Sequence, residues 1–306
     1  MRNSLIRTML LATAMGSLAA CGGGGGGGGV ASIAPPPPPP PPPPSFMPVN
    51  IFPSITTSTE FATLGFELTG NPAAPLIKDG FSVRYDAVSN LYIFDLPSHA
   101  PGALQASSSN DTYWYGGLPT GSILWPPMAV LKPTPTNPQI QLNYTSFASY
   151  LQAGPMEDLP HGVVAFGVPT AASAMPTTGS ATMNAIVAGF SNGGLDVIGG
   201  TATLNFDFGA GTLAGRFDPV LTPYYGTTSY GLGTYTFNNT VFGIGSSTFS
   251  GNLVHGNPLL TGAFNGLFTG PNGQELMARW TANYFVQGVT AQPEQMFGVW
   301  VGKKCC

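Results

Sequence analysis

The chain has 306 residues, of which 7% are charged, 43% are hydrophobic and 11% are aromatic, and it contains 42 glycines. Nine basic residues against thirteen acidic ones cannot form the clustered basic surface that phosphates require, which excludes nucleic-acid binding. Disorder is disfavoured as well, because so many apolar and aromatic side chains can form a buried core. Beyond the first 50 residues, the remaining chain is long enough for one large β domain or two smaller ones.

Residues 1–20 have the features of a secretory signal peptide. Arg2 and Arg7 form a short basic region, and an apolar run from Met9 to Ala20 follows. This run of about a dozen residues is too short to span a bilayer, which takes roughly 20 residues. We therefore expect the leader to be removed on export.

The apolar run ends in Leu18-Ala19-Ala20-Cys21, which resembles the lipobox of bacterial lipoproteins. The resemblance implies cleavage before Cys21, lipidation of Cys21 and firm membrane anchoring by several acyl chains. In enterobacterial lipoproteins, an Asp directly after the lipidated cysteine keeps the protein in the inner membrane. Here Gly22 takes that position, so the resemblance favours delivery to the outer membrane. The alternative is an ordinary secretory leader with a chance cysteine.

Residues 21–50 predict a tether between the lipid and the folded part. Gly22–Gly29 is a run of eight glycines, which is typical of a flexible coil. Pro35–Pro44 is a run of ten prolines, which forms a stiff left-handed helix of roughly 31 Å at about 3.1 Å per residue. The alternative for the proline run is a ligand for a partner domain.

Residues 51–170 are expected to form a β-rich, handle-like domain. Phe81–Tyr85 and Leu91–Leu96 predict a hairpin across Ala87-Val88-Ser89-Asn90, and Gln139–Leu151 and Gly162–Val168 are later strand candidates. Proline-rich connections between them suit loops and edges better than central strands.

Residues 175–304 show the regular alternation of an antiparallel meander. In Thr203–Phe208 and in Glu275–Phe285, every second residue is large or apolar, and turns with glycine separate such runs every 8–15 residues. About eight strands can be counted. The sequence thus predicts an all-β protein: an about eight-stranded antiparallel up-and-down β-barrel preceded by the smaller handle-like domain, with an open β-sandwich as the alternative.

Three strands of this region repeat one pattern, in which a glycine stands between two large residues of the same face. Because glycine weakens a strand, its repetition predicts tight coiling around a crowded interior. We expect a β-branched side chain at these positions to collide with the large residues two places away on the same strand. We expect Phe206, Phe249, Phe264 and Phe268 to point inside. The three glycines are Gly215, Gly251 and Gly266.

The last 130 residues contain a series of motifs in a fixed order. The series begins at Thr178-Gly179-Ser180-Ala181-Thr182, continues in Gly262-x-Phe264-x-Gly266-x-Phe268-x-Gly270-Pro271 followed by Glu275-Leu276, and ends in Phe297-Gly298 and the basic Lys303. With these motifs, of which the second is the most specific, the region resembles the β-barrel domain of the transferrin-binding protein B family of surface lipoproteins. This implies one barrel lobe with a handle domain, whereas the family has two lobes with long ligand-gripping loops that have no assignable counterpart here.

Catalysis and metal binding are not expected, and no cofactor is predicted. The motif Gly189-Phe190-Ser191-Asn192-Gly193 matches G-x-S-x-G, but turn and strand residues follow it where a nucleophile elbow needs a helix. His99, His161 and His255 are far apart and lack metal-ligand spacing. We therefore predict that the chain is not an enzyme.

Clustered aromatic residues next to Gly and Pro are the candidates for recognition loops. For Trp114 and Trp125 the alternative is a plug that joins handle to barrel. Cys305 and Cys306 are an unassigned tail, either free or paired between molecules, because adjacent cysteines rarely bond to each other. The recognition candidates are Tyr113, Trp114, Tyr115, Trp125, Tyr224 and Tyr225.

Two functions compete at this point. The first is a lipid-anchored binding module of the outer membrane, exposed at the cell surface, that captures a solute or macromolecule. Its partners would be the membrane through Cys21, a TonB-dependent outer-membrane receptor or an extracellular protein ligand. The second is a structural or adhesive surface lipoprotein.

Overall fold

The computed structural model describes residues 46–69, 76–120, 123–151, 160–191, 196–224, 228–286 and 292–305. The signal peptide, Cys21 and the tether up to residue 45 lie outside these residues, so the expectations for them stay predictions. Within the described part, no helix is long and apolar enough to cross a membrane. The described residues form antiparallel strands and two 3-10 turns, Ala172–Ala174 and Pro271–Gly273, as the all-β prediction requires.

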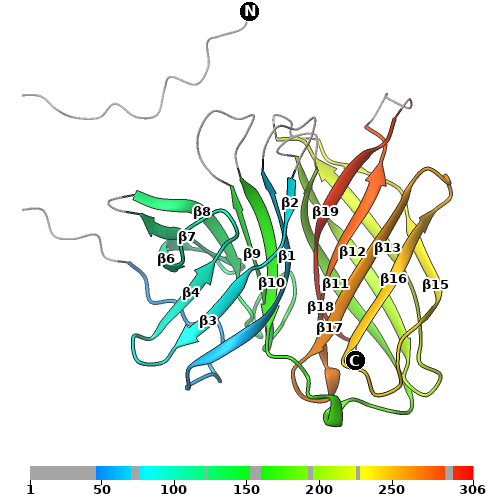
Figure 1. The fold of residues 1–306 in the computed structure, drawn as a ribbon, viewed down its shortest axis with the longest axis horizontal. Coiled ribbons are helices and arrows are strands. Elements are labelled where there is room, and N and C mark those ends of the chain that lie inside the picture. The colour runs from blue at the N-terminus through cyan, green and yellow to red at the C-terminus, as the bar shows by residue number, and fades with distance from the viewer. Residues whose placement is uncertain are drawn as a thin grey trace, which may run out of the picture. The chain divides into compact units, whose positions relative to one another are not determined.

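The first half of the chain forms a ten-stranded sheet that nearly closes on itself (Figure 1). Its order is β5-β4-β3-β1-β10-β9-β8-β7-β6, with β2 on β1, and only Leu104 separates the two end strands in sequence. We call it the first sheet. Its strands are β1 (Thr59–Thr69), β2 (Leu76–Lys78), β3 (Ser82–Asp86), β4 (Leu91–Asp95), β5 (Gly102–Ala103), β6 (Gln105–Ser109), β7 (Tyr113–Thr120), β8 (Ile123–Leu131), β9 (Thr145–Leu151) and β10 (His161–Gly167).

The second half forms a closed eight-stranded barrel, which confirms the predicted architecture. Its strands follow one another around the barrel in chain order, and β19 pairs with β11 while the short β14 adds to β13. We call it the barrel. Its strands are β11 (Ser180–Ser191), β12 (Val197–Asp207), β13 (Thr212–Thr222), β14 (Tyr230–Gly231), β15 (Tyr235–Val241), β16 (Thr248–His255), β17 (Thr261–Thr269), β18 (Glu275–Tyr284) and β19 (Glu294–Lys304).

Two strand predictions in the first sheet had different outcomes. The hairpin of β3 and β4 is confirmed, and Asn90 takes the left-handed conformation (φ 57°) that its turn needs. The strand predicted over Gln139–Leu151 is wrong in its first half, since β9 begins only at Thr145. The backbone before it bonds to side chains instead, as the junction described below shows.

Aromatic side chains fill the barrel interior. Phe206, Phe249, Phe264 and Phe268 are at most 3% exposed, as predicted, and their rings contact one another at centroid distances from 4.7 Å. Eight strands enclose a space that side chains can fill without leaving a channel. Other large side chains buried in the same core are Phe208, Phe217, Tyr235, Phe237, Phe242, Trp280, Tyr284 and Trp300.

The three glycines make room for rings that come from the neighbouring strand. A Cβ at Gly251 would lie 2.6 Å from the ring of Phe264, and one at Gly215 would lie 2.6 Å from that of Phe237. Both pairs are directly opposite each other in the ladder. The prediction of crowding is confirmed, but its source is corrected: the crowding ring belongs to the adjacent strand, not to the residue two places along the same strand.

A buried polar cluster lies inside the first sheet. The Glu67 side chain is fully buried, and the Tyr150 hydroxyl donates a 2.6 Å hydrogen bond to its Oε2. His99 Nε2 lies 4.0 Å from the same oxygen, with 9% of the His99 side chain exposed. Burial lowers the pKa of His99 below its usual 6.5; nearby Glu67 opposes this shift and Lys78 adds to it.

This cluster predicts a pH dependence of stability. Because the folded protein holds His99 neutral, the unfolded chain takes up the proton first as the pH falls below about 6.5. The contribution of His99 to the unfolding free energy is therefore complete above that pH and is lost below it. We expect denaturant midpoints measured between about pH 7 and pH 5 to fall more steeply for the wild type than for His99→Gln. Equal slopes would show that His99 does not titrate in this way.

Candidate functional site at the junction of the two sheets

The first sheet and the barrel share an apolar junction. The outer face of β19 carries Phe297, Val299 and Val301, which pack against the first sheet although the inner face of β19 lines the barrel core. A strand that is apolar on both faces is buried on both faces. The junction core consists of Leu68, Leu131, Ile140, Leu142, Phe147, Val163, Ala165, Phe190, Met277, Phe297, Val299 and Val301.

Glu275, at the start of β18, fastens the barrel to the chain segment before β9. Its carboxylate accepts hydrogen bonds from the backbone N–H groups of Asn143 (2.7 Å) and Tyr144 (2.9 Å). Only 2% of Glu275 is exposed, and burial raises the pKa of its carboxyl, while the two N–H groups oppose that shift. These bonds divert backbone donors from strand pairing, which explains why β9 starts late.

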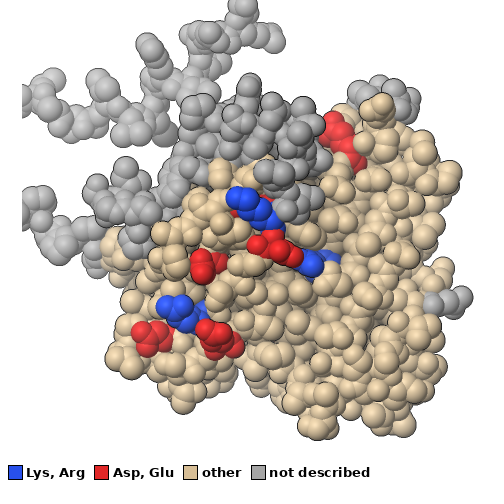
Figure 2. All heavy atoms as spheres, in the orientation of Figure 1, with Lys and Arg blue, Asp and Glu red and all other residues tan. Residues whose placement is uncertain are grey.

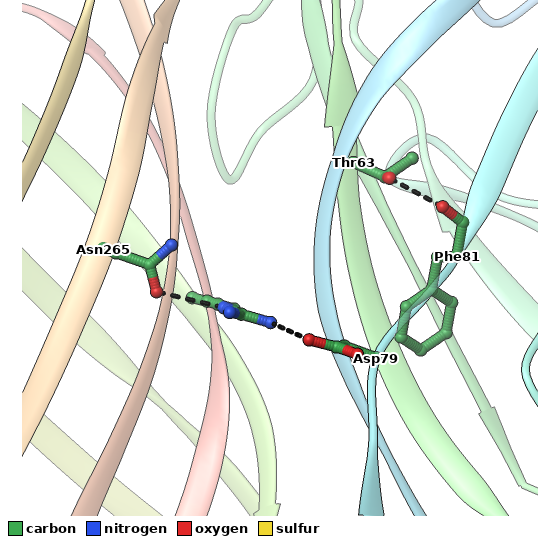
Figure 3. A network of polar contacts seen from close by, with 5 residues as sticks. Thr63, Asp79, Phe81 and Asn265 are labelled. Carbon is green, nitrogen blue, oxygen red and sulfur yellow. Dashed lines mark hydrogen bonds and ion pairs between the residues drawn. The ribbon is translucent and has the colours of Figure 1, made fainter.

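Arg279, on the outer face of β18, makes a second connection (Figure 3). Its Nε donates to Asn265 Oδ1 of β17 (3.0 Å), and its Nη1 donates to Asp79 Oδ2 of the first half (3.2 Å). The guanidinium also lies over the ring of Phe66, 5.2 Å from its centroid. Asn265 therefore holds Arg279 in place.

The segment between β8 and β9 is fixed by one buried amide. Asn137 is 2% exposed, and its Nδ2 donates to the carbonyl oxygens of Lys132 (2.8 Å) and Thr112 (3.2 Å). Its Oδ1 accepts from the backbone N–H of Gln139 (2.9 Å). With both ends held, at Asn137 and by Glu275, the segment presents the side chains in between at fixed positions.

Those side chains line a groove of about 480 Å³ between this segment and the outer face of the barrel. We call it the junction groove. Its lining is rich in amides and hydroxyls, and Lys303 is the one charged residue among the described residues that line it. The lining residues are Asn137, Pro138, Gln139, Ile140, Gln141, Asn184, Ala185, Ile186, Thr201, Ala202, Thr203 and Lys303.

The protein has few charged side chains, which make up 7% of its residues. On the face of the molecule in Figure 2, most of the described surface is uncharged. Among the described residues, no group of three His, Cys, Asp or Glu side chains is placed to hold a metal ion. The arrangement can form directional hydrogen bonds with a polar ligand on its outer surface.

The predicted aromatic site is only partly assembled. Tyr113, Trp114 and Tyr115 lie in strand β7, so their placement in a loop is wrong. Trp114 is 9% exposed and belongs to the core of the first sheet, where the ammonium of Lys132 lies over its ring; it joins neither a recognition surface nor the junction. Tyr113 donates from its hydroxyl to Gln139 Oε1 (2.8 Å), and Tyr115 is 38% exposed beside it.

The remaining predicted positions are not gathered at the groove. Tyr224 is 48% exposed after β13, and its backbone N–H bonds to Asp196 Oδ1 (2.9 Å). The side chains of Trp125 and Tyr225 lie outside the described residues, as does Cys21. Of the described recognition candidates, Tyr113 is the one that contacts a lining residue of the groove, Gln139.

The structure also places the G-x-S-x-G motif and the histidines. Ser191 is buried at the end of β11, and the next described element is strand β12, not the helix of a nucleophile elbow. His99 lies in the connection between β4 and β5, His161 packs on Phe190 at the junction, and His255 ends β16. The histidines are therefore separate, as their spacing predicts.

Sequence reasoning missed the residues that build the groove. Gln139 and Gln141 lie in a segment that the sequence predicts to be a strand. Lys303 is a basic residue at the end of a strand, a position that does not by itself indicate a site. One signal was present in the sequence, because Phe297, Val299 and Val301, at the outward positions of β19, are apolar and so predict a second packed face. Nothing in the sequence indicates which segment covers that face.

Among known proteins, the chain matches solved structures only. No protein-family model and no curated protein sequence matches the chain. A variant of transferrin binding protein B from Haemophilus parasuis Hp5 matches at 12% identity with a TM-score of 0.48, covering 80% of this chain and 45% of its own. The matched protein carries the name of the family that the last 130 residues resemble.

Two further matches cover nearly all of the matched chain. One is a variant of transferrin binding protein B from Actinobacillus pleuropneumoniae H49, with 11% identity, a TM-score of 0.38 and coverage of 80% of this chain and 100% of that one. The other is described as a surface lipoprotein, with 10% identity, a TM-score of 0.38 and coverage of 79% and 99%. The chain spans less than half of the Haemophilus parasuis chain, and at these identities the likeness concerns the fold alone.

Proposed function

We propose that the chain is a lipid-anchored binding module on the surface of a bacterial outer membrane. The anchor in this proposal is Cys21, in the sequence that resembles a lipobox, and the Gly and Pro runs of residues 22–44 are its proposed link to the folded part. The folded part presents its ligand site on the outside of the protein.

The observation that carries this proposal is the contrast between the barrel interior and the junction groove. Aromatic side chains such as Phe217, Trp280 and Trp300 fill the interior, which leaves the lumen to the protein core rather than to a ligand. The junction groove, in contrast, combines about 480 Å³ with polar side chains held at fixed positions. Ligand sites typically pair a concavity of this size with a few well-placed polar groups.

Two kinds of macromolecular partner fit this role. An extracellular protein would meet the outer surface of the folded part, and a TonB-dependent receptor would receive a captured solute in the same membrane. Both remain predictions, and the proposal is tested first at the anchor.

We expect Cys21→Ser to abolish incorporation of a labelled fatty-acid analogue and to release the protein from the membrane fraction. The physical reason is that several acyl chains give firm anchoring, whereas the unlipidated chain has no comparable attachment. The measurement is metabolic labelling followed by fractionation. Cys305→Ser is the matched control, and it should keep both the label and the membrane location. Equal labelling of Cys21→Ser and wild type would refute the proposed anchor.

A further inference from the structure

Side chains of the junction groove form an ordered row across the barrel wall. Thr203 of β12 lies opposite Asn184 of β11, and Asn184 lies opposite Lys303 of β19. Their sequence neighbours Leu204, Met183 and Ala185 point into the barrel core, so the row itself faces outward. With strands about 4.8 Å apart, a hydroxyl, an amide and an ammonium group follow one another over roughly 10 Å.

The opposite wall of the groove adds two more amides. The hydroxyl of Tyr113 donates to Gln139 Oε1 (2.8 Å), and the ammonium of Lys303 donates to Gln141 Oε1 (3.3 Å). Burial raises the pKa of Tyr113, which keeps its hydroxyl protonated as a donor. Both glutamine oxygens are thus engaged, and each amide keeps its –NH₂ group to donate to a ligand.

The lining favours a ligand that both donates and accepts hydrogen bonds and carries one negative charge. Amides and hydroxyls match sugar hydroxyl groups, which can act as donor or acceptor. Of the lining residues that the structure describes, Lys303 alone is charged. The carboxylate of Glu275, its neighbour across the ladder, is engaged by backbone N–H groups. A carboxylate on the ligand could therefore pair with Lys303 without facing a protein carboxylate.

An extended peptide fits this wall less well. Recognition of a peptide by strand addition requires an unpaired strand edge. β11 pairs with both β12 and β19, and β12 pairs with both β11 and β13. The wall therefore offers side chains alone, which is how a saccharide is bound.

We propose that the junction groove binds an acidic saccharide, with Lys303 pairing with its carboxylate and with Asn184, Thr203, Gln139 and Gln141 bonding to its hydroxyl groups. This rests on the proposed function as a binding module and names the ligand class of the same site. The saccharide can be a free sugar or the end of a glycan on a larger molecule, since both present the same chemistry.

The test is calorimetric titration of the full mature chain in detergent with three probes: N-acetylneuraminic acid, glucuronic acid and glucose. We expect the two acids to bind and glucose, which has no carboxylate, to bind about tenfold or more weakly. Lys303→Gln should remove this preference for acids. Lys304→Gln is the matched control, because it makes the same charge change at an exposed neighbour outside the groove lining and should bind as wild type does.

Further measurements distinguish a free sugar from the end of a glycan, and a saccharide ligand from a peptide. Asn184→Ala should weaken the acids and glucose alike, and a sialylated glycoprotein should lose binding after sialidase treatment if the natural source is a glycan end. Absence of binding by either acid would overturn the inference, and so would an acidic tripeptide that binds as well as the sugars do. Neither result touches the proposed anchor, which is measured separately at Cys21.

Discussion

Phe264→Ala is expected to lower the unfolding free energy by about 3–5 kcal/mol. The ring is 3% exposed and contacts Phe237 and Trp300 at centroid distances of 4.9 Å and 5.2 Å. It also covers Gly251 on the neighbouring strand, so no side chain stands ready to fill the space that truncation leaves. Both the lost transfer free energy and the cavity therefore add to the cost. Urea midpoints followed by tryptophan fluorescence measure it.

Asn252→Ala is the control for this prediction. Asn252 lies on β16 with its side chain exposed, in the middle of the same part of the barrel wall. Exposed substitutions of this kind usually change stability by less than about 0.5 kcal/mol. If both variants lost the same stability, Phe264 would not be a core residue and the assignment of strand faces would fail.

Gly266→Val is expected to destabilise the barrel by about 1–3 kcal/mol despite the better strand propensity of valine. A Cβ at Gly266 would lie 2.5 Å from the ring of Phe249 and 2.7 Å from the carbonyl oxygen of Met277. The ring could shift, but the carbonyl belongs to the paired backbone of β18 and cannot move far. The steric cost therefore exceeds the gain of up to about 1 kcal/mol that valine brings to a strand.

Gly199→Val separates the steric effect from strand propensity. Gly199 lies in β12 opposite Val220, and a Cβ there would meet nothing within 4 Å. We expect this variant to be as stable as the wild type or more stable by up to about 1 kcal/mol, with midpoints measured in the same denaturant series. Destabilisation of the same size in both variants would mean that close packing at Gly266 is not the cause.

The barrel could be predicted from the sequence because the patterns that specify its strands lie within short stretches of the chain. In Thr203–Phe208 and in Glu275–Phe285 the period of two assigns each side chain to a face, and glycine marks the turns and the crowded positions. Once about eight such strands follow one another with short connections, closure is the arrangement that removes both edges. The structure confirms the faces of all four predicted core phenylalanines.

The groove could not be predicted because it depends on contacts between distant segments. Glu275 binds the backbone of Asn143 and Tyr144 more than 130 residues earlier in the chain, and no local pattern announces that pairing. Because of the same contact, the strand expected to begin at Gln139 begins only at Thr145. Trp114 shows the opposite error: an aromatic cluster beside glycine suggests a loop, but burial in a core stabilises an aromatic strand residue more than exposure does.

Display of the folded part on the outside of the cell is tested most directly by protease treatment of intact cells. We expect a protease of broad specificity to cut the tether within residues 22–45 and to release a folded fragment that contains residues 46–305 into the medium. Mass spectrometry of the medium would identify that fragment while periplasmic marker proteins stay intact. A protein that remains full-length and cell-bound until the outer membrane is permeabilised would contradict surface display.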